Sequence, residues 1–314
     1  MIRNTAPGLL LTAAMLLCAS AIGAASRTAA PREPARPAEP LRELPLPAVP
    51  DTLRTPQRRA AYILDHFWDA MDFADTLRTR DRGFMEQNLA NYFSLFPHAD
   101  TAALVPTVEQ LLHAAGGDRR TTTLLAEIAE KYLYEPDSPL YDESHYQRFL
   151  RALLRLPHPD AAETVRYRYQ LASIRKNSPG TRAADFRYID RQGRRRTLGR
   201  TQGSRLLLIF YDPACDHCLR TMERLAHDAS LGRLIETGEL TVLALFADGE
   251  EAEWRRSLGN LPEKWLAGLD ISGVQEHELY VLRELPALYL LDGKKHVILK
   301  NTDPEQIRSH FGSR

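Results

Sequence analysis

Residues 206–218 have the sequence LLLIFYDPACDHC, and this stretch decides the fold of the C-terminal half. Its first six residues form a continuous apolar run, which is typical of a β-strand buried on both faces. Asp212 and the residues after it break the run, and a segment with helical spacing follows. We therefore expect a strand, a short turn and a helix, with Cys215 at the helix N-terminus and Cys218 one turn further on. The expected apolar face of this helix consists of Leu219, Met222, Leu225 and Ala226.

The spacing of Cys215 and Cys218 suits thiol–disulfide exchange. Unpaired N–H groups and the positive end of the helix dipole stabilise a thiolate at a helix N-terminus, and the thiolate is the species that attacks disulfides. The second thiol lies within reach of the first, so it can resolve a mixed disulfide. We predict that both cysteines are catalytic, and we expect no cofactor and no metal.

Two residues between the cysteines are predicted to tune the pair in opposite senses. A protonated His217 would favour the thiolate of Cys215 and make the disulfide more oxidising. The negative charge of Asp216 would oppose that effect. We therefore expect an intermediate reduction potential.

The flanking sequence extends the β pattern. Phe186–Asp190, a Gln192–Gly193 turn and Thr197–Leu198 predict a β-hairpin before the apolar strand. Further along, the pattern predicts strands at Leu240–Phe246 and Val297–Lys300, and helices at Gly273–Tyr280 and Pro304–Phe311. The segment Leu285–Gly293 also enters a strand, and it begins with a Leu-Pro pair.

CxxC at a strand–helix junction, a preceding hairpin and a downstream Leu285–Pro286 together resemble the thioredoxin superfamily, with the TlpA-like branch of envelope proteins nearest. The resemblance covers about Ser178 to the end. It implies a thioredoxin fold, which is an α/β fold with a central mixed sheet flanked by helices. It also implies thiol–disulfide oxidoreductase activity that leans toward reduction, with a membrane thiol carrier as electron partner. The resemblance also implies that Pro286 follows a cis peptide bond, packs beside Cys215 and helps to bind the substrate backbone.

The sequence departs from that family at three places. Tyr211 and Ala214 stand where tryptophans are common around the dithiol. The buried acid that moves protons to the second cysteine would fall at Ile209, which cannot titrate. Asp212, in the turn, is the alternative proton acceptor.

Residues 55–177 predict an all-α helical domain before the thioredoxin-like domain at 178–314. Thr55–Pro56 is a typical helix start, and apolar residues then recur at helical spacing to Met71. The remaining expected helices are Phe84–Phe96, Ala102–Ala115, Thr121–Tyr134, Glu143–Leu156 and Ala161–Ile174. The sequence leaves open whether this domain is a substrate-docking platform or a structural companion.

The whole architecture resembles two-domain envelope proteins of Bacteroidetes type, in which a helical domain of unknown function precedes a thioredoxin-like domain. The resemblance rests on Tyr62–Phe73, on Tyr132–Pro139 and on Asp212–Pro213 before the dithiol. It implies no particular substrate.

Residues 1–25 have the layout of a signal peptide, with Arg3, an apolar stretch to Cys18 and small residues up to Ala25. Two alternatives remain: lipidation at Cys18, or retention as an uncleaved anchor, and either would tether the chain to a membrane. In all three cases, a cleaved signal peptide, a lipidated Cys18 or an uncleaved anchor, the chain is exported, so we expect a periplasmic or cell-envelope protein. Residues 26–54 are rich in proline and predict an extended linker.

Composition excludes several classes of protein. Lys plus Arg and Asp plus Glu both number 41, and no long basic run favours nucleic acid. Three cysteines are too few for a multi-disulfide scaffold. A structural zinc site needs about four ligands, and neither a second CxxC nor suitably spaced histidines are present. The expected partners are disulfide-bearing or dithiol envelope proteins. The alternatives are a stable structural disulfide and a binding module that docks partners through its helical domain.

Overall fold

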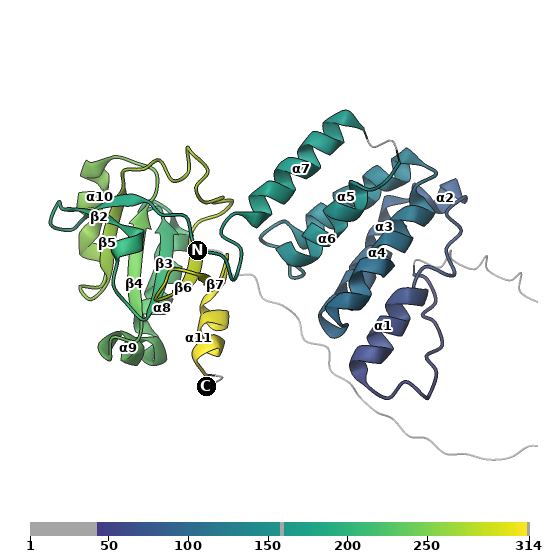
Figure 1. Cartoon of the computed structure of the whole chain (residues 1–314), viewed down its shortest axis with the longest axis horizontal. Coiled ribbons are helices and arrows are strands. Elements are labelled where there is room, and N and C mark those ends of the chain that lie inside the picture. Colours follow the sequence, from purple (N-terminus) through teal and green to yellow (C-terminus); the bar gives the residue numbers. More distant parts are fainter. Residues whose placement is uncertain (1–42, 158–159, 313–314) are drawn as a thin grey trace, which may run out of the picture. The chain divides into compact units, whose positions relative to one another are not determined.

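The computed structural model describes residues 43–157 and 160–312 (Figure 1). The predicted signal peptide, Cys18 and most of the predicted linker lie outside these residues, so those predictions are untested. Within the described part of the chain, no helix is both long enough and apolar enough to span a membrane.

The N-terminal part of the described chain is helical, as predicted (Figure 1). Its helices are α1 (Pro56–His66), α2 (Thr76–Thr79), α3 (Arg82–Ser94), α4 (Thr101–Ala115), α5 (Arg119–Leu133), α6 (Glu143–Leu153) and α7 (Ala161–Arg175). Thr55 caps α1, because its side chain accepts the Arg58 N–H, and Pro56 occupies the first helical position. Aspartate side chains cap five of the others: Asp75, Asp81, Asp118, Asp142 and Asp160. These caps explain why α3 and α5 begin two residues earlier than predicted.

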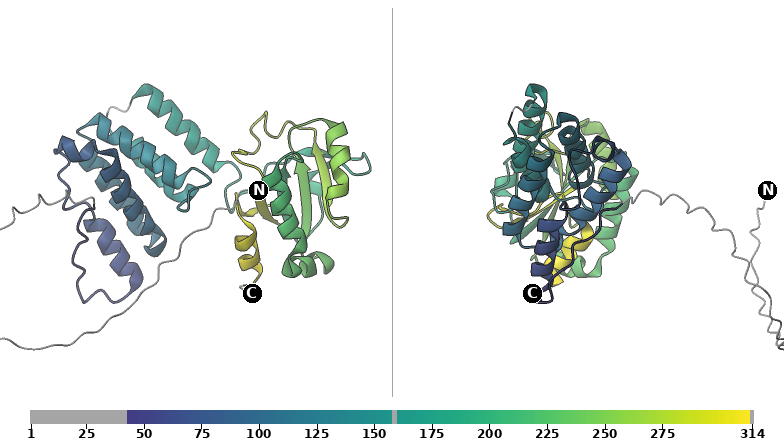
Figure 2. Two further views of the ribbon diagram at one scale, coloured as in Figure 1. Left: turned by 180° about the vertical axis from the view of Figure 1, so that it is seen from behind. Right: turned by 90° about the vertical axis from the view of Figure 1, so that its right-hand side faces the viewer.

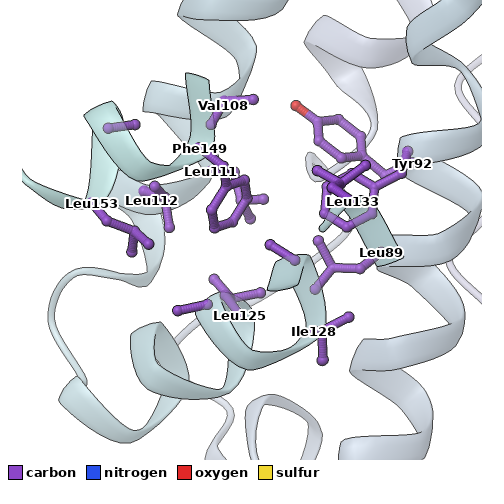
Figure 3. Packing of buried hydrophobic residues seen from close by; sticks show 14 of the residues in the cluster. Leu89, Tyr92, Val108, Leu111, Leu112, Leu125, Ile128, Leu133, Phe149 and Leu153 are labelled. Carbon is purple, nitrogen blue, oxygen red and sulfur yellow. The ribbon is translucent and has the colours of Figure 1, made fainter. Parts of the chain in front are cut away.

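The helices enclose one apolar core, built mainly from α3, α4, α5 and α6 (Figure 3). The labelled side chains in Figure 3 converge from these four helices: Leu89, Tyr92, Val108, Leu111, Leu112, Leu125, Ile128, Leu133, Phe149 and Leu153. The first helix is shorter than predicted and ends at His66, but Phe67 and Met71 still enter the core from the turns that follow.

The last residues of the predicted linker are packed against this core. Leu44 is buried, and its N–H donates to Oδ1 of Asn88 at 2.8 Å. Asn88 is itself buried on α3 and donates from Nδ2 to the carbonyl of Phe84. Part of the proline-rich segment therefore belongs to the folded helical region.

The C-terminal part contains a mixed seven-stranded sheet in the order β2-β1-β5-β4-β3-β6-β7 (Figures 1 and 2). The strands are β1 (Arg187–Asp190), β2 (Arg195–Thr197), β3 (Arg205–Tyr211), β4 (Thr241–Phe246), β5 (Leu266–Asp270), β6 (Ala287–Asp292) and β7 (Val297–Leu299). Strands β3, β4 and β5 run parallel, whereas β6 is antiparallel to β3 and β1 is antiparallel to β5. A helical region followed by this α/β sheet confirms the predicted fold class.

Both faces of β3 are buried, which explains its continuous apolar run. Leu207, Ile209 and Tyr211 face one core, shared with α8 (Asp216–His227), α9 (Ala229–Glu236), α10 (Glu251–Ser257) and α11 (Pro304–Gly312). Seen from behind (Figure 2, left), α8 lies in front of the sheet. Leu206, Leu208 and Phe210 face a second core. On α8, Met222 and Leu225 are buried as predicted, but Ala226 is exposed because it lies beside the buried stripe.

Two elements differ from the prediction for local reasons. The expected helix at Gly273–Tyr280 is a series of turns, because Gly273 (φ 64°) and Glu278 (φ 46°) take the left-handed conformation. Strand β5 was not predicted because it is short and contains Gly268. A Cβ at Gly268 would lie 2.7 Å from Cδ2 of Tyr188, so the strand pairing requires glycine.

Candidate active site

The sheet register brings the two parts of the predicted site together. Phe210, near the end of β3, pairs with Ala287, the first residue of the antiparallel β6. The turn after β3 and the segment before β6 therefore lie at the same edge of the sheet. That edge holds Cys215 on one side and the Leu285–Pro286 peptide, which is cis as expected, on the other.

Cys215 is the N-cap of α8 and is half-buried. Its Sγ accepts a hydrogen bond from the backbone N–H of Cys218 at 3.2 Å. On its other side, Sγ lies 3.8 Å from the carbonyl oxygen of Leu285, to which the thiol donates. An amide N–H directed at sulfur, at the positive end of a helix, is the environment that stabilises a thiolate. This carbonyl contact was missed at the sequence level, because the family resemblance placed only Pro286 beside Cys215.

Cys218 occupies a different environment, although it is one helical turn away. Its side chain is fully buried in the core that α8 shares with the sheet. Burial raises the pKa of the Cys218 thiol to about 12. A backbone hydrogen bond from Asp212 opposes this rise, and Cys215 and the charge of Asp212 add smaller increases. At neutral pH Cys218 is thus a protonated thiol. Both cysteines are free, and their positions suit an attacking sulfur and a protected resolving sulfur.

Asp212 is the acidic residue at hand for moving the proton of Cys218. It is half-buried in the turn after β3, and its charge contributes to the raised pKa of the Cys218 thiol. Its Oδ1 accepts the N–H of Ala214 at 2.7 Å, and its carbonyl accepts the N–H of Cys215 at 3.1 Å. Ile209 lies in the apolar core on the same face as Cys218. The turn, rather than the strand, therefore supplies the nearby carboxylate.

The two predicted tuning residues point into solvent. Asp216 and His217 are both exposed on the first turn of α8. Within residues 43–157 and 160–312, neither side chain is recorded in a hydrogen bond or an ion pair. Water and salt screen charges at such positions, so their influence on the dithiol stays a prediction.

An arginine-lined groove of about 600 Å³ lies on the hairpin side of the sheet. Arg194, directly before β2, and Arg196, on β2, pair with Asp190 at 2.9 and 3.0 Å. The described lining includes neither cysteine nor Pro286, so this groove is separate from the dithiol. Over the described ranges, no three His, Cys, Asp or Glu side chains gather closely enough to hold a metal ion.

Comparisons with known proteins bear on both halves of the chain. Residues 22–177 match a family described as a domain of unknown function, DUF5106. Comparison with curated proteins gave no match. Among solved structures, a thioredoxin-like protein from Bacteroides caccae is 30% identical, with a TM-score of 0.82. The match covers 86% of this chain and 98% of that protein.

Two structures from Bacteroides fragilis match a smaller part of the chain. A conserved protein of unknown function is 34% identical over 43% of this chain and 98% of its own, with a TM-score of 0.41. The C-terminal domain of an uncharacterized protein is 30% identical over 44% of this chain and 99% of its own, with a TM-score of 0.43. The family assignment rests on the Bacteroides caccae protein, which matches over nearly its whole length. By that match, the chain belongs to the family of thioredoxin-like proteins, and a domain of unknown function precedes its thioredoxin-like domain.

Proposed function

We propose that this protein is an exported thiol–disulfide oxidoreductase of the cell envelope, which reduces disulfides in other envelope proteins through Cys215 and Cys218. The observation that carries the proposal is the contrast between the two sulfurs. Cys215 is half-buried at a helix N-terminus with an amide N–H on its sulfur, whereas Cys218 is fully buried, which raises the pKa of its thiol. An exchanging dithiol needs this asymmetry, because one sulfur must attack a substrate and the other must wait.

The proposed reaction begins with attack by the Cys215 thiolate on a substrate disulfide. A mixed disulfide forms, and the first substrate sulfur leaves as a thiolate that takes up a proton. Cys218 then gives its proton to the Asp212 carboxylate and attacks Sγ of Cys215. The second substrate sulfur leaves and is protonated. The substrate disulfide has gained two electrons and two protons, and the protein now carries a Cys215–Cys218 disulfide.

The segment that begins β6 has a proposed role in binding the substrate. Leu285 and Pro286 lie beside Cys215, where an extended substrate segment can approach the attacking sulfur. For the protein to act again, an external dithiol must return two electrons to the Cys215–Cys218 disulfide. We propose a membrane thiol carrier as this donor, in line with the TlpA-like resemblance and with export by the N-terminal leader.

Insulin reduction tests the activity, with dithiothreitol as the electron source. Wild type should accelerate the precipitation of reduced insulin chains, and Cys215→Ser should reduce the rate to the uncatalysed level. Cys218→Ser should retain the attacking sulfur and accumulate mixed disulfides at Cys215, detectable by mass spectrometry. A wild type as inactive as Cys215→Ser, together with no trapped adduct, would favour the adaptor alternative.

The direction of exchange requires a separate measurement. Alkylation of thiols in intact cells, before lysis, reports the redox state of the pair in its own compartment. A reductase kept charged by a carrier should be found mainly with Cys215 and Cys218 as free thiols. A pair found mainly as the disulfide would instead indicate an oxidase.

A further inference from the structure

The segment before the cis peptide has no regular structure of its own. Residues 271–286, between β5 and β6, form only turns, bends and extended chain. Their first part is fixed by Asp270, whose carboxylate accepts two backbone N–H groups, and by buried Val274 and Tyr280. The last six residues, 281–286, which we call the proline loop, follow this fixed part and reach Cys215 through the Leu285 carbonyl.

One side chain joins the proline loop to the helical region. Within the described part of the chain, Arg283 is the one residue of 281–286 whose side chain is recorded in hydrogen bonds or ion pairs. Its guanidinium donates to the carbonyl of Tyr134, and Nη2 donates to both carboxylate oxygens of Glu135 at 3.2 Å. Its Cζ also lies 3.8 Å from the centre of the Tyr134 ring. Only 24% of the Arg283 side chain is exposed, so most of it is covered.

The partners of Arg283 are well suited to hold a cation. Tyr134 is the C-cap of α5, where exposed carbonyls and the negative end of the helix dipole favour positive charge. Its aromatic face adds a cation–π contact, and both carboxylate oxygens of Glu135 accept from Nη2. Arginine can satisfy all three partners at once, because its planar guanidinium stacks on a ring while its several N–H groups donate outward.

The residues that bind Arg283 are themselves held by further contacts. The Tyr134 ring is buried and stacks on Tyr146, with ring centres 4.7 Å apart and planes within 16°. The hydroxyl of Tyr146 donates to Gln170 on α7, and Gln170 in turn donates to Glu130 on α5. Three helices, α5, α6 and α7, therefore fix the surface that receives Arg283.

We propose that Arg283 is a positioning residue through which the helical domain holds the proline loop in place beside Cys215. This inference rests on the proposed function, and it gives the helical domain a role in catalysis without contact to the substrate. A loop fixed before binding does not have to be ordered by the substrate, so affinity for extended protein substrates increases. Small disulfides that do not lie along the loop gain nothing from it.

The test compares a protein substrate with a small disulfide, using the full chain. For Arg283→Ala we expect a KM for insulin about tenfold higher, because binding must now order the loop, with kcat largely unchanged. The rate with 5,5′-dithiobis(2-nitrobenzoate), a small disulfide, should stay at the wild-type value. Arg283→Lys should recover part of the lost affinity for insulin. Lysine keeps the positive charge over the Tyr134 ring, but it lacks the second nitrogen that donates to Tyr134 and Glu135 at the same time.

The matched control is Arg255→Ala. Arg255 makes the same two kinds of contact on α10, an ion pair with Glu251 and a cation–π contact with Trp254 at 5.6 Å. This variant should keep the wild-type KM for insulin. An unchanged KM in Arg283→Ala would overturn the inference. Equal losses with insulin and with the small disulfide would also overturn it, because they would indicate general damage rather than loss of positioning.

Backbone dynamics separate failure of this inference from failure of the proposed function. The 15N NMR order parameters of residues 281–285 should be lower in Arg283→Ala than in wild type, whether or not the protein reduces insulin. If wild type is inactive but these order parameters fall in the variant, Arg283 does hold the proline loop and the proposed function fails. If wild type is active and the order parameters are unchanged, the positioning role of Arg283 is contradicted.

Discussion

Replacement of Cys215 by serine isolates the thiol of Cys218, whose reactivity follows from its burial. At pH 7 a thiol with a pKa of about 12 is ionised in about one molecule in 100,000, against about 3% for an ordinary cysteine. Alkylation by iodoacetamide proceeds through the thiolate. The thiolate of Cys218 is therefore about 3000-fold scarcer than that of a free cysteine, but a more basic thiolate is also about 30-fold more nucleophilic. Cys218 in the Cys215→Ser variant should react about 100-fold more slowly than a free cysteine, before any steric hindrance from burial is counted.

The assay follows iodoacetamide adducts by mass spectrometry at several pH values. The rate at Cys218 should rise about tenfold per pH unit between pH 8 and 10, as expected well below a pKa. Cys218→Ser, which leaves only Cys215 in the folded domain, is the matched control and should react rapidly. In concentrated urea the two variants should react alike. A rate at Cys218 within tenfold of a free cysteine at pH 7 would refute the reasoning, because it would show that burial does not hold the thiol protonated.

Other predictions concern charged groups at and away from the dithiol. Asp212→Asn should slow resolution of the mixed disulfide about 10- to 100-fold, because Cys218 loses its proton acceptor. The decay rate of a preformed Cys215–glutathione adduct measures this step. An unchanged decay rate would remove Asp212 from the mechanism. Glu143→Gln should lower the free energy of unfolding by about 3 kcal/mol in urea at pH 7, because Lys300, whose side chain is 4% exposed, would lose its ion-pair partner; a loss under about 1 kcal/mol would contradict the pairing. Burial lowers the pKa of His145, so the unfolded chain binds a proton at this residue more readily than the folded chain does. The free energy of unfolding should therefore fall as pH drops below about 6.5. His145→Gln should show a smaller fall between pH 7 and 5, and an equal fall would show that His145 does not cause this pH dependence.

The elements that the sequence predicted correctly are those whose signal is local. The run from Leu206 to Tyr211 has both faces buried in the structure, and the break at Asp212 places Cys215 at the start of α8. The helical period likewise predicted α3 to α6, with bounds that differ from the structure by at most three residues. The cis bond before Pro286 followed from the family resemblance rather than from any pattern in the chain.

The features that were missed depend on contacts between distant residues. Strand β5 is stabilised by pairing with β1 and β4, and its short sequence with Gly268 gives little signal by itself. The segment 273–280 was expected to be a helix, but the left-handed residues Gly273 and Glu278 divert it into turns. Arg283 and Tyr134 are separated by 149 residues, so no local pattern could connect them.

The central claim is that Cys215 and Cys218 form and break one disulfide reversibly. Equilibration of the purified protein with glutathione buffers of graded potential, followed by acid quenching and peptide mass mapping, measures this directly. We expect both thiols to disappear together in a single two-electron transition, with the Cys215–Cys218 disulfide as the product. A persistent glutathione adduct on Cys215 beside an unoxidised Cys218 would contradict the account.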